Sequence, residues 1–239
     1  MLFERKRAFG HAECPQVKQI QTYSKQRGFT LVEIAVVLVI IGLLLGAILK
    51  GQELIENSRV KNATNTLSSI SAASLGYLDR YRAVAGDDGP LATLQARGSA
   101  WAGITVAGNS NSILAAPTNP FAAPTAEHLA FWQQLRAAGF LTGSAADTGI
   151  AALPKNAFGG GLTGIATLTT QLNNINATVI CLSQVPGKSA TALDNQLDDG
   201  RPNTGTLRAT LQVGAANTAP AAVATTYSED QRYTVCSPL

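Results

Sequence analysis

The chain has 239 residues, of which 46% are hydrophobic and only 14% are charged, a composition that suits one modest domain plus one apolar segment and argues against two large domains. The formal charge of +3 is placed unevenly: residues 1–28 hold six basic and two acidic side chains (6 − 2 = +4), and the remainder holds 12 basic and 13 acidic ones (12 − 13 = −1). The basic balance therefore belongs to the N-terminus, and we expect no nucleic-acid partner for the rest of the chain.

Residues 29–49 contain a single ionisable side chain, Glu33. A helix of this length covers roughly the 30 Å hydrocarbon core of a bilayer. Lys25 and Arg27 precede the segment and only Lys50 follows it, which predicts a cytoplasmic N-terminus and an exported body. The segment is too long for a cleaved secretory signal, and no small-x-small site stands before Lys50. Hydropathy alone would favour an uncleaved signal anchor holding a periplasmic domain.

The carboxylate of Glu33 does not fit a plain anchor, because a charge inside a bilayer costs about 2.5–3.5 kcal/mol on insertion scales. The stretch RGFTLVE, residues 27–33, followed by an unbroken apolar run, resembles the processing site of prepilins, the precursors of type IV pilins and of type II secretion pseudopilins. The resemblance implies that residues 1–28 form a leader peptide, which a membrane aspartyl peptidase removes between Gly28 and Phe29. It further implies that the new Phe29 amine is N-methylated and pairs with Glu33 of a neighbouring subunit.

One helix is predicted to continue from the apolar segment to about Arg82. No proline occurs between Pro15 and Pro90, and residues 60–81 carry an apolar stripe at steps of three and four. The stripe comprises Val60, Ala63, Leu67, Ile70, Ser74, Tyr77 and Tyr81. We therefore assign residues 29–49 to the membrane-spanning half and residues 50–84 to the periplasmic half.

Residues 85–239 are expected to form the globular head. The sequence predicts a long loop over residues 98–125 with a short strand at 104–106, then a helix at 126–138 capped by Gly139, with His128 on its surface. Strands are predicted at 162–170, 177–182, 206–213 and 232–236, where β-branched residues alternate with polar ones. The predicted fold class is α+β and pilin-like: a long N-terminal helix packed on a small antiparallel sheet.

Two cysteines remain after the expected cleavage, Cys181 and Cys236. An even pair in an exported domain predicts a disulfide, and the resemblance agrees, because many type IV pilins close a C-terminal disulfide-bounded region.

Three carboxylates, Asp194, Asp198 and Asp199, gather near the end of a short predicted helix that Ser189 would cap and whose Ala190, Leu193 and Leu197 would face inward. They can serve turns, with Arg201 and Arg208 balancing their charge. The alternative is a Ca²⁺ site, since some pseudopilins bind Ca²⁺ in an Asp-containing C-terminal loop, although the spacing is not that of an EF-hand. We expect no other cofactor.

No catalytic constellation stands out, so we expect a structural subunit rather than an enzyme. The expected function is a subunit, major or minor, of a type IV pilus-like filament; the alternatives are a type II secretion pseudopilin and, third, a signal-anchored periplasmic protein. The implied partners are other pilin subunits, the prepilin peptidase and methylase, the inner-membrane assembly machinery and the membrane itself. The expected location is the inner membrane in a single pass, with the N-terminus cytoplasmic and the head periplasmic. After assembly it would be an extracellular pilus or a periplasmic pseudopilus.

Overall fold

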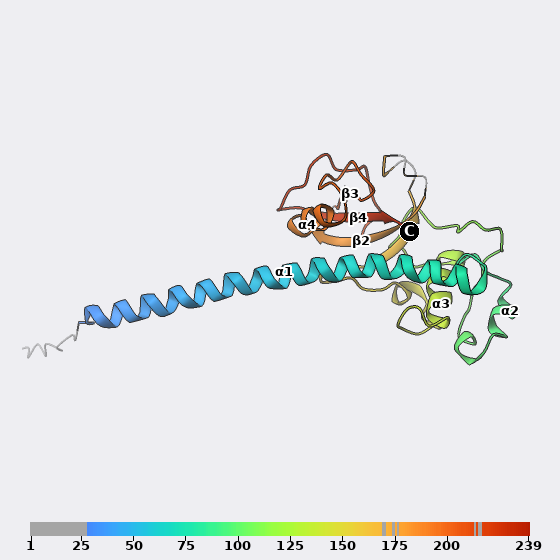
Figure 1. Ribbon diagram of the computed structural model, residues 1–239, viewed down its shortest axis with the longest axis horizontal. Helices are drawn as coiled ribbons and strands as arrows, with labels where there is room; N and C mark the ends of the chain where they lie inside the picture. The colour runs from blue at the N-terminus through green and yellow to red at the C-terminus, as the bar shows by residue number, and fades with distance from the viewer. Residues whose placement is uncertain (1–27, 169–170, 174, 176, 213, 215–216) are drawn as a thin grey trace, which may run out of the picture. The chain divides into compact units, whose positions relative to one another are not determined.

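The computed structural model describes residues 28–168, 171–173, 175, 177–212, 214 and 217–239 (Figure 1). The chain forms two compact units that meet between Ile48 and Leu49. Each unit is treated separately below: the first contains the apolar beginning of a long helix, and the second contains the rest of that helix and the head. The expected leader lies outside the described residues except for Gly28.

The long helix, α1, runs from Leu31 to Tyr81. Within the second unit it buries one stripe, made of Val60, Ala63, Leu67, Ile70, Ala73 and Tyr77. Steps of three and four residues place these side chains on one face, which packs into the core of the head. The predicted helix and its stripe are confirmed, except that Ala73 takes the buried position expected for Ser74, which is half-buried.

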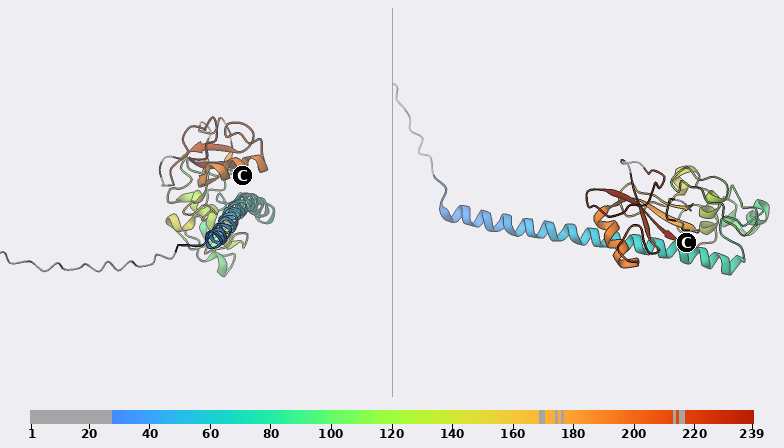
Figure 2. Two further views of the ribbon diagram at one scale, coloured as in Figure 1. Left: turned by 90° about the vertical axis from the view of Figure 1, so that its left-hand side faces the viewer. Right: turned by 90° about the horizontal axis from the view of Figure 1, so that it is seen from above.

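The head contains a four-stranded antiparallel sheet in the order β1-β2-β4-β3. Its strands are β1 (Thr163–Thr167), β2 (Thr178–Pro186), β3 (Arg208–Leu211) and β4 (Arg232–Pro238). All four were predicted, although β2 runs on to Pro186 through an irregularity between Leu182 and Val185. In the head, the sheet and the helix that follows β2 lie beside the earlier part of α1. The helices α2 and α3 lie near the last turns of α1 (Figures 1 and 2). The α+β class is therefore confirmed.

The remaining helices are short. They are α2 (Leu91–Gln95), η1 (Ser99–Trp101), α3 (Ala126–Ala137), η2 (Gly149–Ala152) and α4 (Gly187–Leu197). Gly139 ends α3 as predicted: it has a φ of 80°, and the N–H groups of Gly139 and Phe140 donate to the carbonyls of Arg136 and Leu135. This pair of bonds is the Schellman arrangement, in which the left-handed position favours glycine.

Polar side chains of α3 hold the long loops of the head. Gln134 accepts from the N–H of Gly86 and donates to the carbonyl of Asp88, while Gln133 accepts from the N–H of Thr105. Glu127 accepts from the N–H of Ala115 in the same way. The strand predicted at 104–106 is wrong, because the N–H of Thr105 is satisfied by a side chain instead of a neighbouring strand.

The end of α1 is joined to the loop that follows it by hydrogen bonds to the buried carboxylate of Asp88. Arg97 donates to Asp88 at 2.7 Å, and the hydroxyl of Tyr77 donates to the same carboxylate oxygen at 2.6 Å. The guanidinium also lies over the rings of Tyr81 and Trp101, 4.8 and 4.9 Å from their centroids. Burial, followed by the hydrogen bond to Asp88, raises the pKa of Tyr77 above its usual range, so the phenol stays a donor. The cluster secures the last turn of α1 to the head.

A disulfide joins Cys181 of β2 to Cys236 of β4, which face each other in the sheet register. Both residues are fully buried. The bridge closes a loop that contains α4, β3 and the segments around them.

Removing this disulfide is expected to lower the free energy of unfolding by about 4 kcal/mol, because the bridge restricts the unfolded chain over a long loop. The variant is Cys181→Ala with Cys236→Ala, which leaves no buried unpaired thiol. Denaturant unfolding of the full chain in detergent measures the change. Reductant should destabilise the natural chain and leave the double variant unchanged; equal stability of the two proteins would contradict the prediction.

His128 is buried in α3, only 3% exposed, so its predicted surface position is wrong. The periodic pattern identified one apolar side of this helix, but loops held by Glu127, Gln133 and Gln134 cover much of the rest. Its Nε2 atom has no hydrogen-bond partner within the described structure, and burial lowers the pKa of His128 to about 4.

Acid is therefore expected to destabilise the head through His128. Because the folded-state pKa lies below the unfolded value of about 6.5, the unfolded chain takes up the proton first as pH falls. Above about pH 6.5, His128 is neutral in both states and does not lower the free energy of unfolding. Between about pH 6.5 and about pH 4, proton uptake by the unfolded chain lowers this free energy by up to about 3 kcal/mol. Melting temperature against pH should fall less steeply for His128→Leu than for the natural chain. Parallel profiles would contradict this.

Candidate functional site: the N-terminal segment

In the described part of the first unit, residues 28–30 lie outside any helix or strand, and the apolar part of α1 follows them. Every residue from 28 to 50 is exposed, with Phe29 at 82% and Leu31 at 89%. By length and composition, this helix contains a stretch long and apolar enough to cross a membrane. A helix that is apolar on all sides needs lipid or other helices around it. These features fit a membrane-anchored precursor.

The Gly28–Phe29 bond, where cleavage is predicted, lies outside the helix. The surroundings of Gly28 are open, since a side chain added there would meet nothing within 4 Å. The scissile bond is thus not buried by the described part of the chain.

Thr30 and Glu33 form a reciprocal pair of hydrogen bonds at the start of α1. The Thr30 N–H donates to Oε2 of Glu33 at 2.8 Å, and the Glu33 N–H donates to Oγ1 of Thr30 at 3.2 Å. The Thr30 hydroxyl also donates to Oε2 at 2.9 Å. This arrangement is a capping box, in which the residue before the helix and the third helical residue satisfy each other's free N–H groups.

Sequence reasoning placed Glu33 at the site but missed Thr30. The spacing of Thr30 and Glu33 is the capping-box pattern, so the signal was present in the sequence. It was overlooked because the resemblance to prepilins assigns Glu33 an intermolecular role. The structure shows that the carboxylate already has partners within its own chain.

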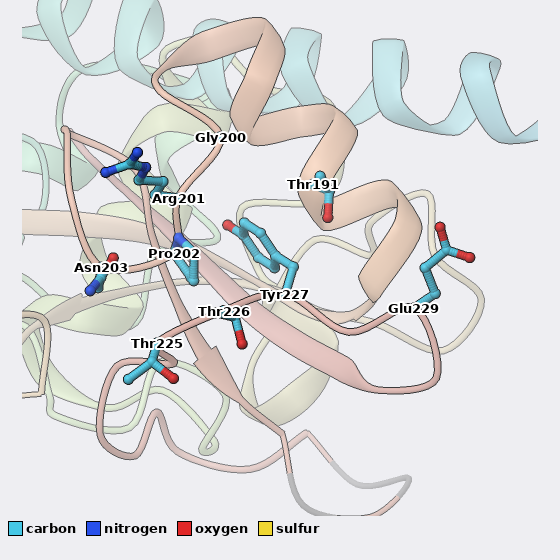
Figure 3. A pocket seen from close by; sticks show the side chains of 9 residues that line it. All are labelled: Thr191, Gly200, Arg201, Pro202, Asn203, Thr225, Thr226, Tyr227 and Glu229. Carbon is cyan, nitrogen blue, oxygen red and sulfur yellow. The ribbon is translucent and has the colours of Figure 1, made fainter.

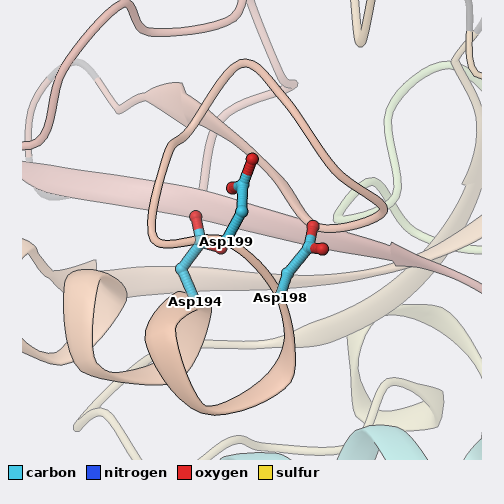
Figure 4. Close-up of side chains that lie close together, drawn as sticks. All are labelled: Asp194, Asp198 and Asp199. Atoms are coloured by element: carbon cyan, nitrogen blue, oxygen red, sulfur yellow. The ribbon is translucent and has the colours of Figure 1, made fainter.

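A second group of predicted residues, Asp194, Asp198 and Asp199, lies at the end of α4. One oxygen from each lies within 4.8 Å of the others, and the side chains point into the loop that follows the helix (Figure 4). The predicted cap by Ser189 is wrong: Ser189 lies within the first turn of α4, and its hydroxyl bonds to Glu56 of α1. Leu197, which was expected to face inward, is 39% exposed because α4 ends there and the chain turns away.

The oxygens of these carboxylates are largely occupied by the chain itself. Asp194 accepts from the hydroxyl of Tyr227 and the N–H of Gly200, at 2.6 and 3.1 Å. Asp198 accepts from the N–H groups of Thr206 and Leu207.

Asp199 accepts from the N–H of Arg201 and the hydroxyl of Thr204, which lowers the pKa of that carboxyl. Burial raises the pKa of Asp194, in part opposed by its hydrogen bonds. Carboxylates suit Ca²⁺ in ligand type, but within the described residues only one of their oxygens, Oδ1 of Asp198, lacks a hydrogen bond. A Ca²⁺ ion bound here would share oxygens that already accept hydrogen bonds from the chain.

An open hollow of about 550 Å³ lies beside this cluster. Figure 3 shows the ring of Tyr227 at its centre, with Arg201 and Pro202 nearby. The described residues that line it include neither His nor Cys.

Ca²⁺ is expected to leave the melting temperature of the full chain unchanged relative to chelator, because the aspartate oxygens are used in turns. Thermal unfolding with Ca²⁺, with Mg²⁺ and with chelator measures this. A rise specific to Ca²⁺ that disappears in Asp198→Asn would show instead that the cluster binds the ion.

Residues 23–49 match the family described as the prokaryotic N-terminal methylation motif. No curated protein matches the chain. The match includes Gly28, Phe29, the capping box and the apolar part of α1 described above, and its members are structural subunits rather than enzymes. The chain therefore carries the N-terminal methylation motif that is characteristic of type IV pilin and pseudopilin precursors.

Proposed function

We propose that this chain is a structural subunit, major or minor, of a type IV pilus-like filament. It is made as a precursor, cleaved between Gly28 and Phe29, methylated on the Phe29 amine and assembled through residues 29–49. The observation that carries the proposal is a single carboxylate, Glu33, in a helical segment that is otherwise apolar and is exposed on all sides. The role is structural, with no enzymatic activity.

Charge balance explains how one carboxylate serves assembly. Cleavage creates one ammonium at Phe29, and methylation keeps its positive charge. Each subunit then carries one cation and one anion in apolar surroundings, where either charge alone is costly. Pairing the ammonium of one subunit with Glu33 of the next satisfies both groups and sets the register of helices that otherwise offer only non-directional apolar contacts.

The edges of the sheet support assembly through the helix. On the β1 side, the N–H of Thr167 donates to the carbonyl of Pro117 at 3.1 Å. On the β3 side, Ala209 donates to the carbonyl of Pro202 and accepts from the N–H of Ala224, at 3.0 and 2.9 Å. These loops occupy groups that a free edge would offer to another strand. The apolar part of α1 is thus the better-suited surface for polymerisation.

The location follows from the charges that flank the apolar segment. Lys25 and Arg27 favour a cytoplasmic N-terminus, which places the head in the periplasm before assembly. The expected partners are other pilin subunits, the prepilin peptidase and methylase, and the inner-membrane assembly machinery. The sizeable head and its disulfide favour an extracellular pilus over a periplasmic secretion pseudopilus.

Glu33→Ala is expected to leave membrane insertion and cleavage intact and to lower incorporation into filaments on the order of 100-fold, because an unpaired buried ammonium remains. Sheared filaments and membranes are compared in a host with the assembly apparatus, and mass spectrometry identifies the mature N-terminus as methylated Phe29.

The matched control is Glu53→Ala, which removes an exposed carboxylate from the same helix. Glu53 pairs with Lys50 at 2.8 Å, and both side chains are more than half exposed. Normal incorporation of Glu33→Ala, or a native chain that retains residues 1–28 in cells with active peptidase, would overturn the proposed function.

A further inference from the structure

The carboxylate of Glu33 is held in one orientation by Thr30. Two donors of the same residue, the N–H and the hydroxyl, converge on Oε2 at 2.8 and 2.9 Å. The hydroxyl in turn accepts from the N–H of Glu33, so its hydrogen is directed toward the carboxylate. This geometry turns the side chain back along the helix toward its N-terminal end.

The second oxygen of the carboxylate remains available. Among residues 28–239 that the structure describes, no hydrogen-bond donor reaches Oε1 of Glu33. A carboxylate can accept several hydrogen bonds, and in apolar surroundings an unused charged oxygen is costly. The capping box therefore fixes Glu33 by one oxygen and presents the other to a further donor.

The predicted cleavage leaves this arrangement in place. Thr30 and Glu33 both lie after the Gly28–Phe29 bond, so the precursor and the mature chain contain the same box. The first helical bond, from the N–H of Ile34 to the carbonyl of Thr30, also lies within the mature part. The carboxylate is thus set in its orientation before a neighbouring subunit arrives.

We propose that Thr30 is a positioning residue for assembly, which holds Glu33 so that its free oxygen meets the Phe29 ammonium of an incoming copy of this chain. The inference rests on the proposed function and adds a residue to it. Pairing costs less side-chain conformational entropy when the carboxylate is already held in one rotamer than when it samples several. Thr30 therefore acts through Glu33 and does not itself contact the ammonium.

The test compares Thr30→Val with Thr30→Ser in the full chain, expressed with the peptidase and assembly apparatus. Valine matches the shape of threonine but lacks the hydroxyl, whereas serine retains it. Incorporation into sheared filaments, measured per cleaved subunit, is expected to fall about three- to tenfold in Thr30→Val and to return in Thr30→Ser. The matched control is Thr66→Val, since the Thr66 hydroxyl donates to the carbonyl of Asn62 on the exposed surface of α1.

If Thr30 acts through Glu33, the variant that combines Thr30→Val with Glu33→Ala has a defined expected result. In the Glu33→Ala background, Thr30→Val should cause no additional loss, because there is no carboxylate left to position. Losses that multiply would show that Thr30 acts independently, and would overturn the inference.

The remaining outcomes distinguish failure of the positioning role from failure of the proposed function. If Glu33→Ala fails to assemble while Thr30→Val assembles at the natural level, the positioning role is wrong and the proposed function stands. If Glu33→Ala itself assembles normally, the proposed function fails. Loss of cleavage in both Thr30→Val and Thr30→Ala would place the hydroxyl at processing instead of assembly, and would also overturn the inference.

Discussion

The structure depends on a change in what covers helix α1 along its length. From residue 28 to about residue 50, the described part of the chain supplies no cover for the apolar side chains of α1, whereas from Val60 to Tyr77 one stripe is buried in the head. The hydrophobic effect therefore acts on the two parts through different partners: lipid or other subunits for the first, and the core of the same chain for the second. One part of this helix is thus buried in a folded domain, and the other part needs apolar surroundings that the domain does not supply.

Polar groups hold this arrangement in place at both ends of the helix. At the start, Thr30 and Glu33 satisfy N–H groups that no helical turn can reach. At the end, Asp88 receives hydrogen bonds from Tyr77 and Arg97, which ties the last turns to the loop beyond. Buried polar groups stabilise a fold only when they are paired, and these contacts are mutual. The same logic explains why α3 carries Gln133 and Gln134 in the interior.

Sequence reasoning found the parts of the fold that depend on periodicity. The extent of α1, the four strands and α3 with its Gly139 cap all leave patterns within a short window of sequence. The pairing of Cys181 with Cys236 followed instead from the cysteine count, because only two cysteines lie beyond the expected leader. It failed where a distant loop decides the environment. His128 looked exposed because one helix face gives no information about the loops that cover the other faces, and the strand at 104–106 was replaced by a bond to Gln133. At the N-terminal site, the local motif identified Glu33, and the capping-box spacing would also have identified Thr30.

The disulfide has a mechanical consequence for the head. Cys181 of β2 and Cys236 of β4 are bridged across neighbouring strands. A pulling force that enters at the C-terminus would pass across the sulfur atoms to β2 and bypass α4, the aspartate loop and β3. The force would not extend those segments even if it strained the sheet around them, so the part of the head between the two cysteines would resist forced unfolding.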